Sequence, residues 1–204
     1  MALQTGNLFS RLRTGSLMKA GGIALVLLLL SAGPGVAGVS ILYQSLGAEH
    51  FTMAVPDRWM VNVGREPDTS ELDKNGRLLP RLVTAMPGDG TPLWFGIWIP
   101  PDISTITDAR EYMAELGGDL LDEIKVTRRR TDTLNTMQVV YVGGTGKKDK
   151  EAMEFYAACI QLNPDTVVIA LYIGPHETTV THGRELRQMI QSLAPISPAT
   201  EAAQ

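Results

Sequence analysis

Apolar and polar positions divide the chain into an uncharged N-terminal stretch and a longer remainder of short patterned segments. No side chain between Lys19 and Glu49 is charged, and Ile23 to Leu30 is uninterrupted aliphatic sequence. A bilayer core is spanned by about 20 apolar residues in a helix. We therefore predict that residues 21–46 form a transmembrane helix or a signal peptide.

Two interpretations of this stretch remain open. In the first, Ile23 to Leu30 is the hydrophobic part of a signal peptide that is cleaved after the small residues Gly35-Val36-Ala37. In the second, the whole stretch is a retained helix, kinked near Pro34, with Tyr43 at the extracytoplasmic interface of the bilayer, where aromatic side chains are favoured. Retention is favoured, because cleavage would leave Val39 to Leu46 as an apolar N-terminus without a role.

Charged residues on either side of the stretch predict its orientation. Arg11, Arg13 and Lys19 precede it, and no basic residue follows until Arg58. By the positive-inside rule, residues 1–20 stay in the cytoplasm and the remainder lies in the periplasm, after a single pass through a bacterial inner membrane. Small residues in the middle of the helix would let a neighbouring membrane helix approach closely. The residues expected to span the membrane or to contact that helix are Leu25, Leu28, Gly33, Pro34, Gly35, Gly38, Ile41 and Tyr43.

Residues 47–195 show the order of short segments that is typical of a single α+β domain. Segments with the length and pattern of strands lie at residues 50–55, 59–63, 81–86, 93–99, 124–130, 136–142, 152–162 and 166–173. Two segments with apolar residues at i, i+3 and i+4 spacing, from Thr107 or Asp108 to Leu121 and from Thr179 to Leu193, predict helices. We expect a largely antiparallel sheet covered by these two helices, followed by a disordered tail at residues 196–204.

Finer features of the domain are also predicted. The C-terminal helix is expected to bury Val180 and Leu186 and to leave His182 at the surface near its first turn. Hairpin turns are expected at Asp132 to Asn135 and at Gly143 to Lys150, where turn-forming residues cluster.

The domain, over roughly residues 48–195, resembles the PsbP-like superfamily, which groups the PsbP extrinsic protein of photosystem II, the Ran-binding Mog protein and the bacterial DcrB-like proteins. The resemblance rests on Val55-Pro56-Asp57-Arg58-Trp59, similar to the VPxGW start of the family, although Arg58 replaces its usual glycine. It also rests on the mid-chain helix with Glu111-Tyr112 and on the final Ile190-Gln191-Ser192-Leu193. The resemblance implies an α/β/α sandwich and an exported accessory or binding domain, often docked to a larger assembly, without a shared catalytic residue.

The distribution of charge excludes some partners. All 22 acidic residues follow residue 48, together with 15 of the 18 basic ones, so this part carries a net charge of about −7. Such a domain repels phosphate backbones, and nucleic acid is not expected as a partner. The single cysteine, Cys159, lies in an apolar segment without neighbouring charges, so we expect a buried thiol rather than a nucleophile.

No pattern of residues points to catalysis or to a cofactor. The segment Gly143–Lys148 lacks the first glycine of a phosphate-binding loop, since Tyr141 stands in its place. His50, His176 and His182 lack the spacing of metal ligands, and no Gly-x-Ser-x-Gly motif is present. The predicted class is therefore non-enzymatic, without a cofactor or a metal.

Two groups of residues are candidates for a partner surface. Arg128, Arg129 and Arg130 form the densest basic run, and at most two of them point to the same face of a strand. They mark either a solvated edge strand or a surface for an acidic partner. Trp94 and Trp98 share one face of their strand, and they either pack under a helix or form an exposed aromatic patch.

Three hypotheses for function follow. The leading one is a membrane-anchored accessory subunit, in contact with lipid through its N-terminal helix, whose exported domain docks on integral membrane-protein subunits. The second is a periplasmic protein, released by cleavage, that binds a small apolar ligand or a lipid. The third is a hydrolase whose site is assembled from distant residues.

Overall fold

The computed structural model describes residues 38–196, with the exception of residues 69, 71 and 74. The elements follow one another as β1 (Gly38–Ser45), β2 (Ala48–Pro56), β3 (Trp59–Val63), β4 (Val83–Pro87), β5 (Trp94–Trp98), α1 (Ile106–Leu120), β6 (Asp122–Leu134), β7 (Met137–Lys148), β8 (Glu151–Asn163), β9 (Thr166–Gly174), α2 (His176–Gln191) and β10 (Ala194–Pro195). The predicted membrane residues Leu25, Leu28, Gly33, Pro34 and Gly35 lie outside the described residues, as do the predicted cytoplasmic segment and nearly all of the predicted tail.

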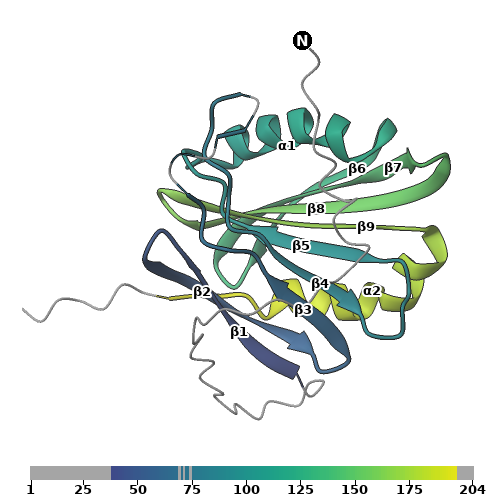
Figure 1. Ribbon diagram of the computed structural model, residues 1–204, viewed down its shortest axis with the longest axis horizontal. Helices are drawn as coiled ribbons and strands as arrows, with labels where there is room; N and C mark the ends of the chain where they lie inside the picture. The colour runs from purple at the N-terminus through teal and green to yellow at the C-terminus, as the bar shows by residue number, and fades with distance from the viewer. Residues whose placement is uncertain (1–37, 69, 71, 74, 197–204) are drawn as a thin grey trace, which may run out of the picture.

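Within the described residues, two antiparallel sheets and two helices make up the fold. Seven strands form the large sheet in the order β3-β4-β5-β9-β8-β7-β6, and three form the small sheet in the order β1-β2-β10. Helix α1 covers one face of the large sheet, and α2 lies with the small sheet on the other (Figure 1). The predicted α+β architecture, with an antiparallel sheet between two helices, is confirmed. The separate small sheet was not predicted.

Two apolar cores lie on either side of the large sheet, and the alternation of side chains along its strands supplies both. In β8, Ala158 and Ile160 point towards α2 and the small sheet, whereas Ala157 and Cys159 point towards α1. Strand β9 is apolar on both faces because both faces are covered. Cys159 is therefore buried, as predicted.

The first strand corrects the predicted end of the hydrophobic segment. Strand β1 pairs with β2 along its whole length, so Gly38, Ile41 and Tyr43 belong to the folded domain. The Ile41 and Tyr43 side chains pack in its core. The prediction that the membrane segment runs to residue 46 is wrong, because a continuous apolar run does not by itself distinguish a helix from a strand. In the part of the chain that is described, no helix has the length and apolar character needed to cross a bilayer.

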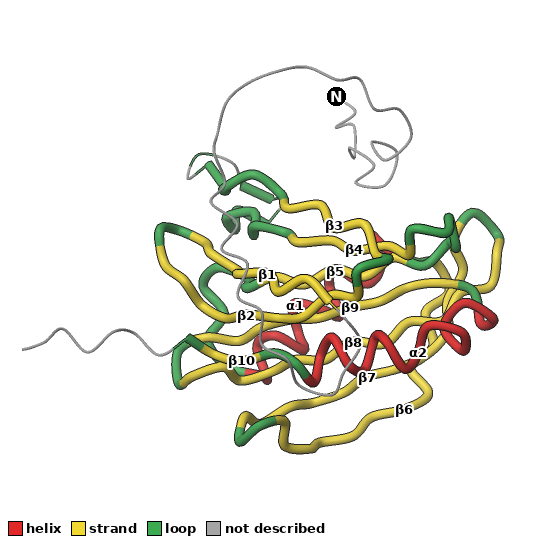
Figure 2. The backbone as a smooth tube through the Cα atoms, turned by 90° about the horizontal axis from the view of Figure 1, so that it is seen from below, coloured by secondary structure: helices red, strands yellow, loops and turns green. Residues whose placement is uncertain are grey.

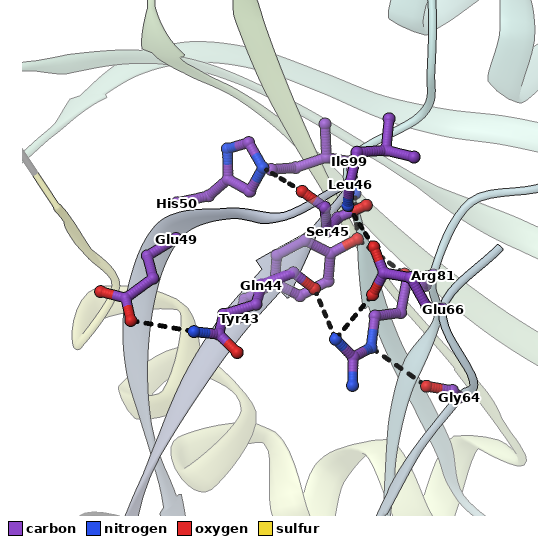
Figure 3. Close-up of polar contacts among 10 residues, drawn as sticks. All are labelled: Tyr43, Gln44, Ser45, Leu46, Glu49, His50, Gly64, Glu66, Arg81 and Ile99. Carbon is purple, nitrogen blue, oxygen red and sulfur yellow. Dashed lines mark hydrogen bonds and ion pairs between the residues drawn. The ribbon is translucent and has the colours of Figure 1, made fainter. Parts of the chain in front are cut away.

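Polar contacts fasten β1 to the rest of the domain (Figure 3). The Tyr43 hydroxyl donates to the Arg81 carbonyl oxygen at 2.7 Å and accepts from the Ile99 N–H at 3.1 Å. The Arg81 guanidinium donates to the Gln44 carbonyl oxygen and to the Glu66 carboxylate, both at 2.9 Å. Burial raises the pKa of Tyr43 to about 12, so the hydroxyl stays protonated and keeps its role as a donor.

Helix α1 begins earlier than predicted. Its N-cap is Thr105, whose hydroxyl oxygen accepts from the Asp108 N–H at 3.1 Å and whose hydroxyl donates to the Asp108 carboxylate at 2.7 Å. Thr107 and Asp108 therefore lie in the first turn and not at the cap.

Helix α2 begins three residues before its predicted start, and its inward face differs from the prediction. Leu186 is buried as expected, but Val180 is 68% exposed and His182 only 3% exposed. The inward positions Thr179, His182, Leu186 and Met189 follow helical spacing. Because the first two of them are polar, a search for apolar residues alone misses them.

The hairpin turns are tighter than predicted. Asn135 and Thr136 connect β6 to β7, and Asp149 and Lys150 connect β7 to β8, all four with positive φ. The glycine-rich segment Gly143–Lys148 is therefore strand and not turn.

Candidate functional site

A buried polar cluster joins the turn between β2 and β3 to α2. Glu185 Oε2 accepts from the Trp59 indole N–H at 3.0 Å and lies 2.9 Å from His182 Nδ1. Its other oxygen accepts from the Arg58 guanidinium. Burial raises the pKa of Glu185, but the hydrogen bonds from His182, Trp59 and Arg58 outweigh it and hold the pKa below its ordinary value.

A hollow of about 710 Å³ opens beside this cluster, between the β2–β3 turn and α2. Polar side chains line it, including Arg184, Arg187 and Gln188. The carboxylate that it reaches, Glu185, is already bound to three donors. This leaves Glu185 little capacity to take a proton from a substrate, so the hollow gives the hydrolase hypothesis no support.

A second cavity lies between α1, β6 and the face of the large sheet that α1 covers; we call it the α1 groove. Its volume is about 740 Å³, within the range of small-molecule sites. Apolar side chains of β7, β8 and β9 form its floor: Val142, Phe155, Ala157, Cys159, Leu171 and Ile173. Burial raises the pKa of the Cys159 thiol to about 11, so the floor carries no charge.

Charged side chains surround the α1 groove. Arg110 and Glu111 line it from α1, and Arg129 lines it from β6. Asp122 and Glu123, two and three residues after the end of α1, line it at the start of β6. The cavity is therefore an apolar channel with polar ends.

Three tyrosines form a row on the opposite face of the large sheet; we call Tyr141, Tyr156 and Tyr172 the tyrosine row. Neighbouring ring centres are 5.5 and 5.6 Å apart, with interplanar angles of 28° and 20°. Each ring is half-buried, and burial raises the pKa of each hydroxyl, that of Tyr172 to about 12. Helix α2 packs against β8 and β9, and β6 lies beyond it (Figure 2). The row therefore runs outward from the edge of α2.

The predicted basic run is divided between the two faces of β6, the edge strand of the large sheet. The Arg130 guanidinium carbon lies 6.0 Å from the centre of the Tyr141 ring. Arg128 is close enough to the tyrosine row to lower the pKa of Tyr156, against the larger effect of burial. Arg129 points the other way, into the α1 groove. Two arginines thus share one face, the maximum that the alternation allows.

Trp94 and Trp98 pack on the α1 side of the large sheet. Trp98 is 3% exposed and lies in the core with Ile106 and Ala109 of α1. Trp94 is half-buried against the same core. Trp98 is therefore not part of an exposed patch, and packing under a helix describes both side chains.

The three histidines have separate partners. His50 Nε2 lies 3.2 Å from the Ser45 carbonyl oxygen, His176 Nδ1 lies 2.8 Å from the Glu154 carboxylate, and His182 belongs to the buried cluster. Across the described ranges, no three His, Cys, Asp or Glu side chains gather in a way that could hold a metal ion.

Sequence reasoning missed both the α1 groove and the tyrosine row. For the row a signal existed, because Tyr156 and Tyr172 lie directly opposite each other in the β8–β9 hairpin. The turn alone does not give that register, because the ladder shifts by one residue between Gln161 and Asn163. For the groove no local signal existed, since its floor comes from β7, β8 and β9, which follow α1 and β6 at a distance in the sequence.

The comparisons with known proteins concern the fold. No family model matches the chain, and no curated protein matches its sequence. Among solved structures, the PsbP protein of Synechocystis sp. PCC 6803 (CyanoP) superposes with a TM-score of 0.53 at 11% identity, over 83% of this chain and 99% of that one. The protein PA94 of Pseudomonas aeruginosa, of unknown function, has a TM-score of 0.46 at 15% identity, over 78% and 99% of the two chains. The Ran-binding protein Mog1p of Saccharomyces cerevisiae has a TM-score of 0.41 at 14% identity, over 78% and 96%. The superposition on CyanoP carries the conclusion that the domain has a PsbP-like fold, as the resemblance implied.

Proposed function

We propose that this chain is an exported, non-enzymatic accessory protein that docks on the extracytoplasmic side of a membrane-protein complex. The observation that carries the proposal is the tyrosine row with the arginines beside it. The partner surface that fits this row is acidic.

The composition of the surface supports docking. Tyrosine and arginine are the residue types that concentrate at the energetically important centres of protein interfaces. Arg128 and Arg130 stand beside rings that are already stacked and half-buried, so little side-chain freedom remains to be lost on binding. The domain as a whole is acidic. Because Arg130 is paired with Asp132, Arg128 is the arginine beside the rings that would orient an acidic partner.

The charges at the α2 end of the row fit the same partner. Arg187, exposed on α2, lowers the pKa of Tyr172 against the larger effect of burial. The acid nearby is Glu154, which accepts from the Thr179 hydroxyl at 2.6 Å and lies 2.8 Å from His176 Nδ1. Burial raises the pKa of Glu154, but these two hydrogen bonds outweigh it and the pKa is lowered. The carboxylate is thus engaged within the domain.

The basic residues Arg11, Arg13 and Lys19 support export of the domain. Because β1 begins at Gly38, the uncharged sequence before this strand is residues 20–37, at the short end of the about 17–25 residues that span a bilayer. The apolar residues of β1 also remove the objection to cleavage. Both points support release after residue 37, so we propose that docking depends on the tyrosine row and not on a permanent anchor.

The test compares charge reversals at two neighbouring residues of one strand. Arg128→Glu and Arg129→Glu change the net charge equally, but Arg128 faces the tyrosine row and Arg129 faces the α1 groove. The full-length tagged chain with either change replaces the wild type in its own cell, complexes are cross-linked in intact cells, and membranes are solubilised in mild detergent. We expect Arg128→Glu to lower the recovery of the cross-linked partner at least about tenfold, and Arg129→Glu to leave it unchanged.

Two results would count against the proposal. Equal loss of the partner in both variants would reveal a general effect of charge. A wild-type chain that migrates only as a free monomer, with or without cross-linking, would contradict docking altogether.

A further inference from the structure

We propose that the α1 groove binds a single acyl chain that carries an anionic head group. The groove lies on the opposite face of the large sheet from the tyrosine row, and the inference does not depend on docking.

Apolar side chains are left exposed around the groove. Ile124 and Val126 of β6 are 40% and 41% exposed, and both line the cavity. Met113 and Leu120 of α1 line it as well, half-buried. An apolar cavity rimmed by exposed apolar side chains is typical of a site for an apolar ligand. A chain lying in the groove would remove these side chains from water.

Small residues leave room for that chain along the wall formed by α1. Ala114, Gly117 and Gly118 all line the groove. A Cβ at Gly117 would lie 3.1 Å from Ile124 Cδ1, so a larger residue there would close the space between helix and strand. A Cβ at Gly118 would meet nothing within 4 Å.

The two arginines of the groove share one half of it. Arg110 is close enough to Cys159 to lower the pKa of the thiol, against the larger effect of burial. Across the sheet, Cys159 lies opposite Val140 and Val140 lies opposite Thr131. Thr131 is two residues from Arg129 in β6, so Arg129 lies in the same half of the groove as Cys159 and Arg110. Within the described part of the chain, neither guanidinium forms an ion pair. Two arginines without an acidic partner, next to an apolar floor, are suited to bind a carboxylate or a phosphate.

The far end of the groove carries the opposite charge. Asp122 and Glu123 lie there, and Glu123 pairs with Lys147 at 2.7 Å. Glu111 also lines the groove beside Arg110, and the arginine end still has one positive charge in excess. A negative head group is therefore attracted to Arg110 and Arg129 and repelled from Asp122, which gives the ligand one orientation.

Fatty acids and lysophospholipids share this chemistry, and the experiment separates them. The full chain is reconstituted in phosphatidylcholine vesicles and equilibrated with a fatty acid that carries a diazirine in its chain, or with a lysophosphatidylglycerol that carries the same chain. After irradiation, labelled peptides are identified by mass spectrometry. We expect label on the strands of the floor, around Phe155 and Leu171, and its suppression by excess palmitate. Label on residues 1–37 is counted separately, and the stronger probe identifies the head group.

Three variants test the site. Ala114→Trp fills the groove and is expected to lower labelling of the floor about tenfold or more. A third probe, the fatty alcohol with the same diazirine chain, carries no charge. Arg110→Glu combined with Arg129→Glu is expected to lower labelling by the fatty acid about tenfold and to leave labelling by this alcohol unchanged. Arg128→Glu, on the other face of the same strand, is the matched control and should retain full labelling.

The inference is overturned if the floor of the wild type is not labelled. It is also overturned if Ala114→Trp, with the circular dichroism and melting temperature of the wild type, is labelled as strongly as the wild type. If Ala114→Trp does not fold, labelling of the variant with both Arg110→Glu and Arg129→Glu is the deciding measurement. Equal loss with acid and alcohol, or an equal loss in Arg128→Glu, rejects the anionic head group.

Discussion

The indole N–H of Trp59 donates to the carboxylate of Glu185 at 3.0 Å, across 126 residues of sequence. This bond joins the first residue of β3 to the middle of α2, and it gives the family-like sequence Val55-Pro56-Asp57-Arg58-Trp59 a structural role. Trp59 is buried, with its ring edge-on to the His182 ring. Arg58, which replaces the glycine of the family pattern, pairs with the same carboxylate.

We predict that Glu185→Leu destabilises the domain. The Trp59 and His182 side chains lose their buried partner, and each buried donor left unpaired costs about 1–3 kcal/mol. Unfolding in urea, followed by tryptophan fluorescence, measures the loss. Glu177→Leu, exposed in the first turn of the same helix, is the control and should change the free energy of unfolding by no more than about 0.5 kcal/mol. If the two substitutions changed the free energy of unfolding equally, the cluster of Glu185, Trp59 and His182 would not stabilise the domain.

The same carboxylate predicts a loss of stability in acid. The pKa of Glu185 is lowered in the folded state, by hydrogen bonds that outweigh the effect of burial. Its contribution is therefore present above the unfolded pKa of about 4.3 and is lost as the pH falls through the folded pKa. We expect the free energy of unfolding of the wild type to fall more steeply below about pH 4.3 than that of Glu185→Gln, which cannot titrate there. Parallel pH profiles for the two proteins would assign the acid sensitivity to other groups.

The parts of the fold that could be predicted are those in which local pattern and tertiary contact agree. The strand at Trp59–Val63 has the predicted bounds, and β9 is apolar on both faces because helices cover both. Helix α2 was only partly predictable, because His182 and Glu185 are polar and are buried by a partner that lies far away in the sequence. Polar residues with distant partners are outside the reach of hydrophobic periodicity.

The first strand shows a different limit. Ile41, Tyr43 and Ser45 alternate inward with exposed Leu42 and Gln44, which is the pattern of a strand. The uncharged residues before Gly38 masked that pattern, since a long apolar stretch favours a membrane helix. The α1 groove could not be predicted at all, because it exists only where α1 and β6 leave part of the sheet uncovered.

We predict that Tyr43→Phe destabilises the domain by about 1–3 kcal/mol, because the substitution removes the partner of the part-buried Ile99 N–H and of the Arg81 carbonyl oxygen. Thermal unfolding of the two proteins measures the difference. Leu42→Ser, at an exposed neighbour in β1, is the control and should have little effect. If residue 43 lay in a membrane helix, Tyr43→Phe would leave the stability of the domain unchanged.

Two glycines are expected to respond in opposite ways. A Cβ at Gly144 would lie 2.1 Å from the Lys125 carbonyl oxygen and 2.9 Å from the Phe155 ring, so Gly144→Ala should separate β6 from β7 at a cost of about 1–3 kcal/mol. Gly118 lies inside α1 with open space around it, so Gly118→Ala should stabilise the domain by about 0.5–1 kcal/mol. Denaturant unfolding distinguishes them, and a shift in the same direction for both would contradict the placement of one of these elements.

The start of β1 at Gly38 leads to a prediction about processing. Gly35-Val36-Ala37 is a small-x-small sequence, and cleavage after Ala37 would leave the whole of β1 in the mature protein. We predict that the protein recovered from its own cell begins at Gly38, as shown by N-terminal sequencing and intact mass. Ala37→Leu should block cleavage and leave the longer chain in the membrane fraction, whereas Ala37→Ser should be processed normally. A wild-type chain that keeps residues 1–37 would instead support the anchored form, and docking through the tyrosine row would then be assisted by the tether.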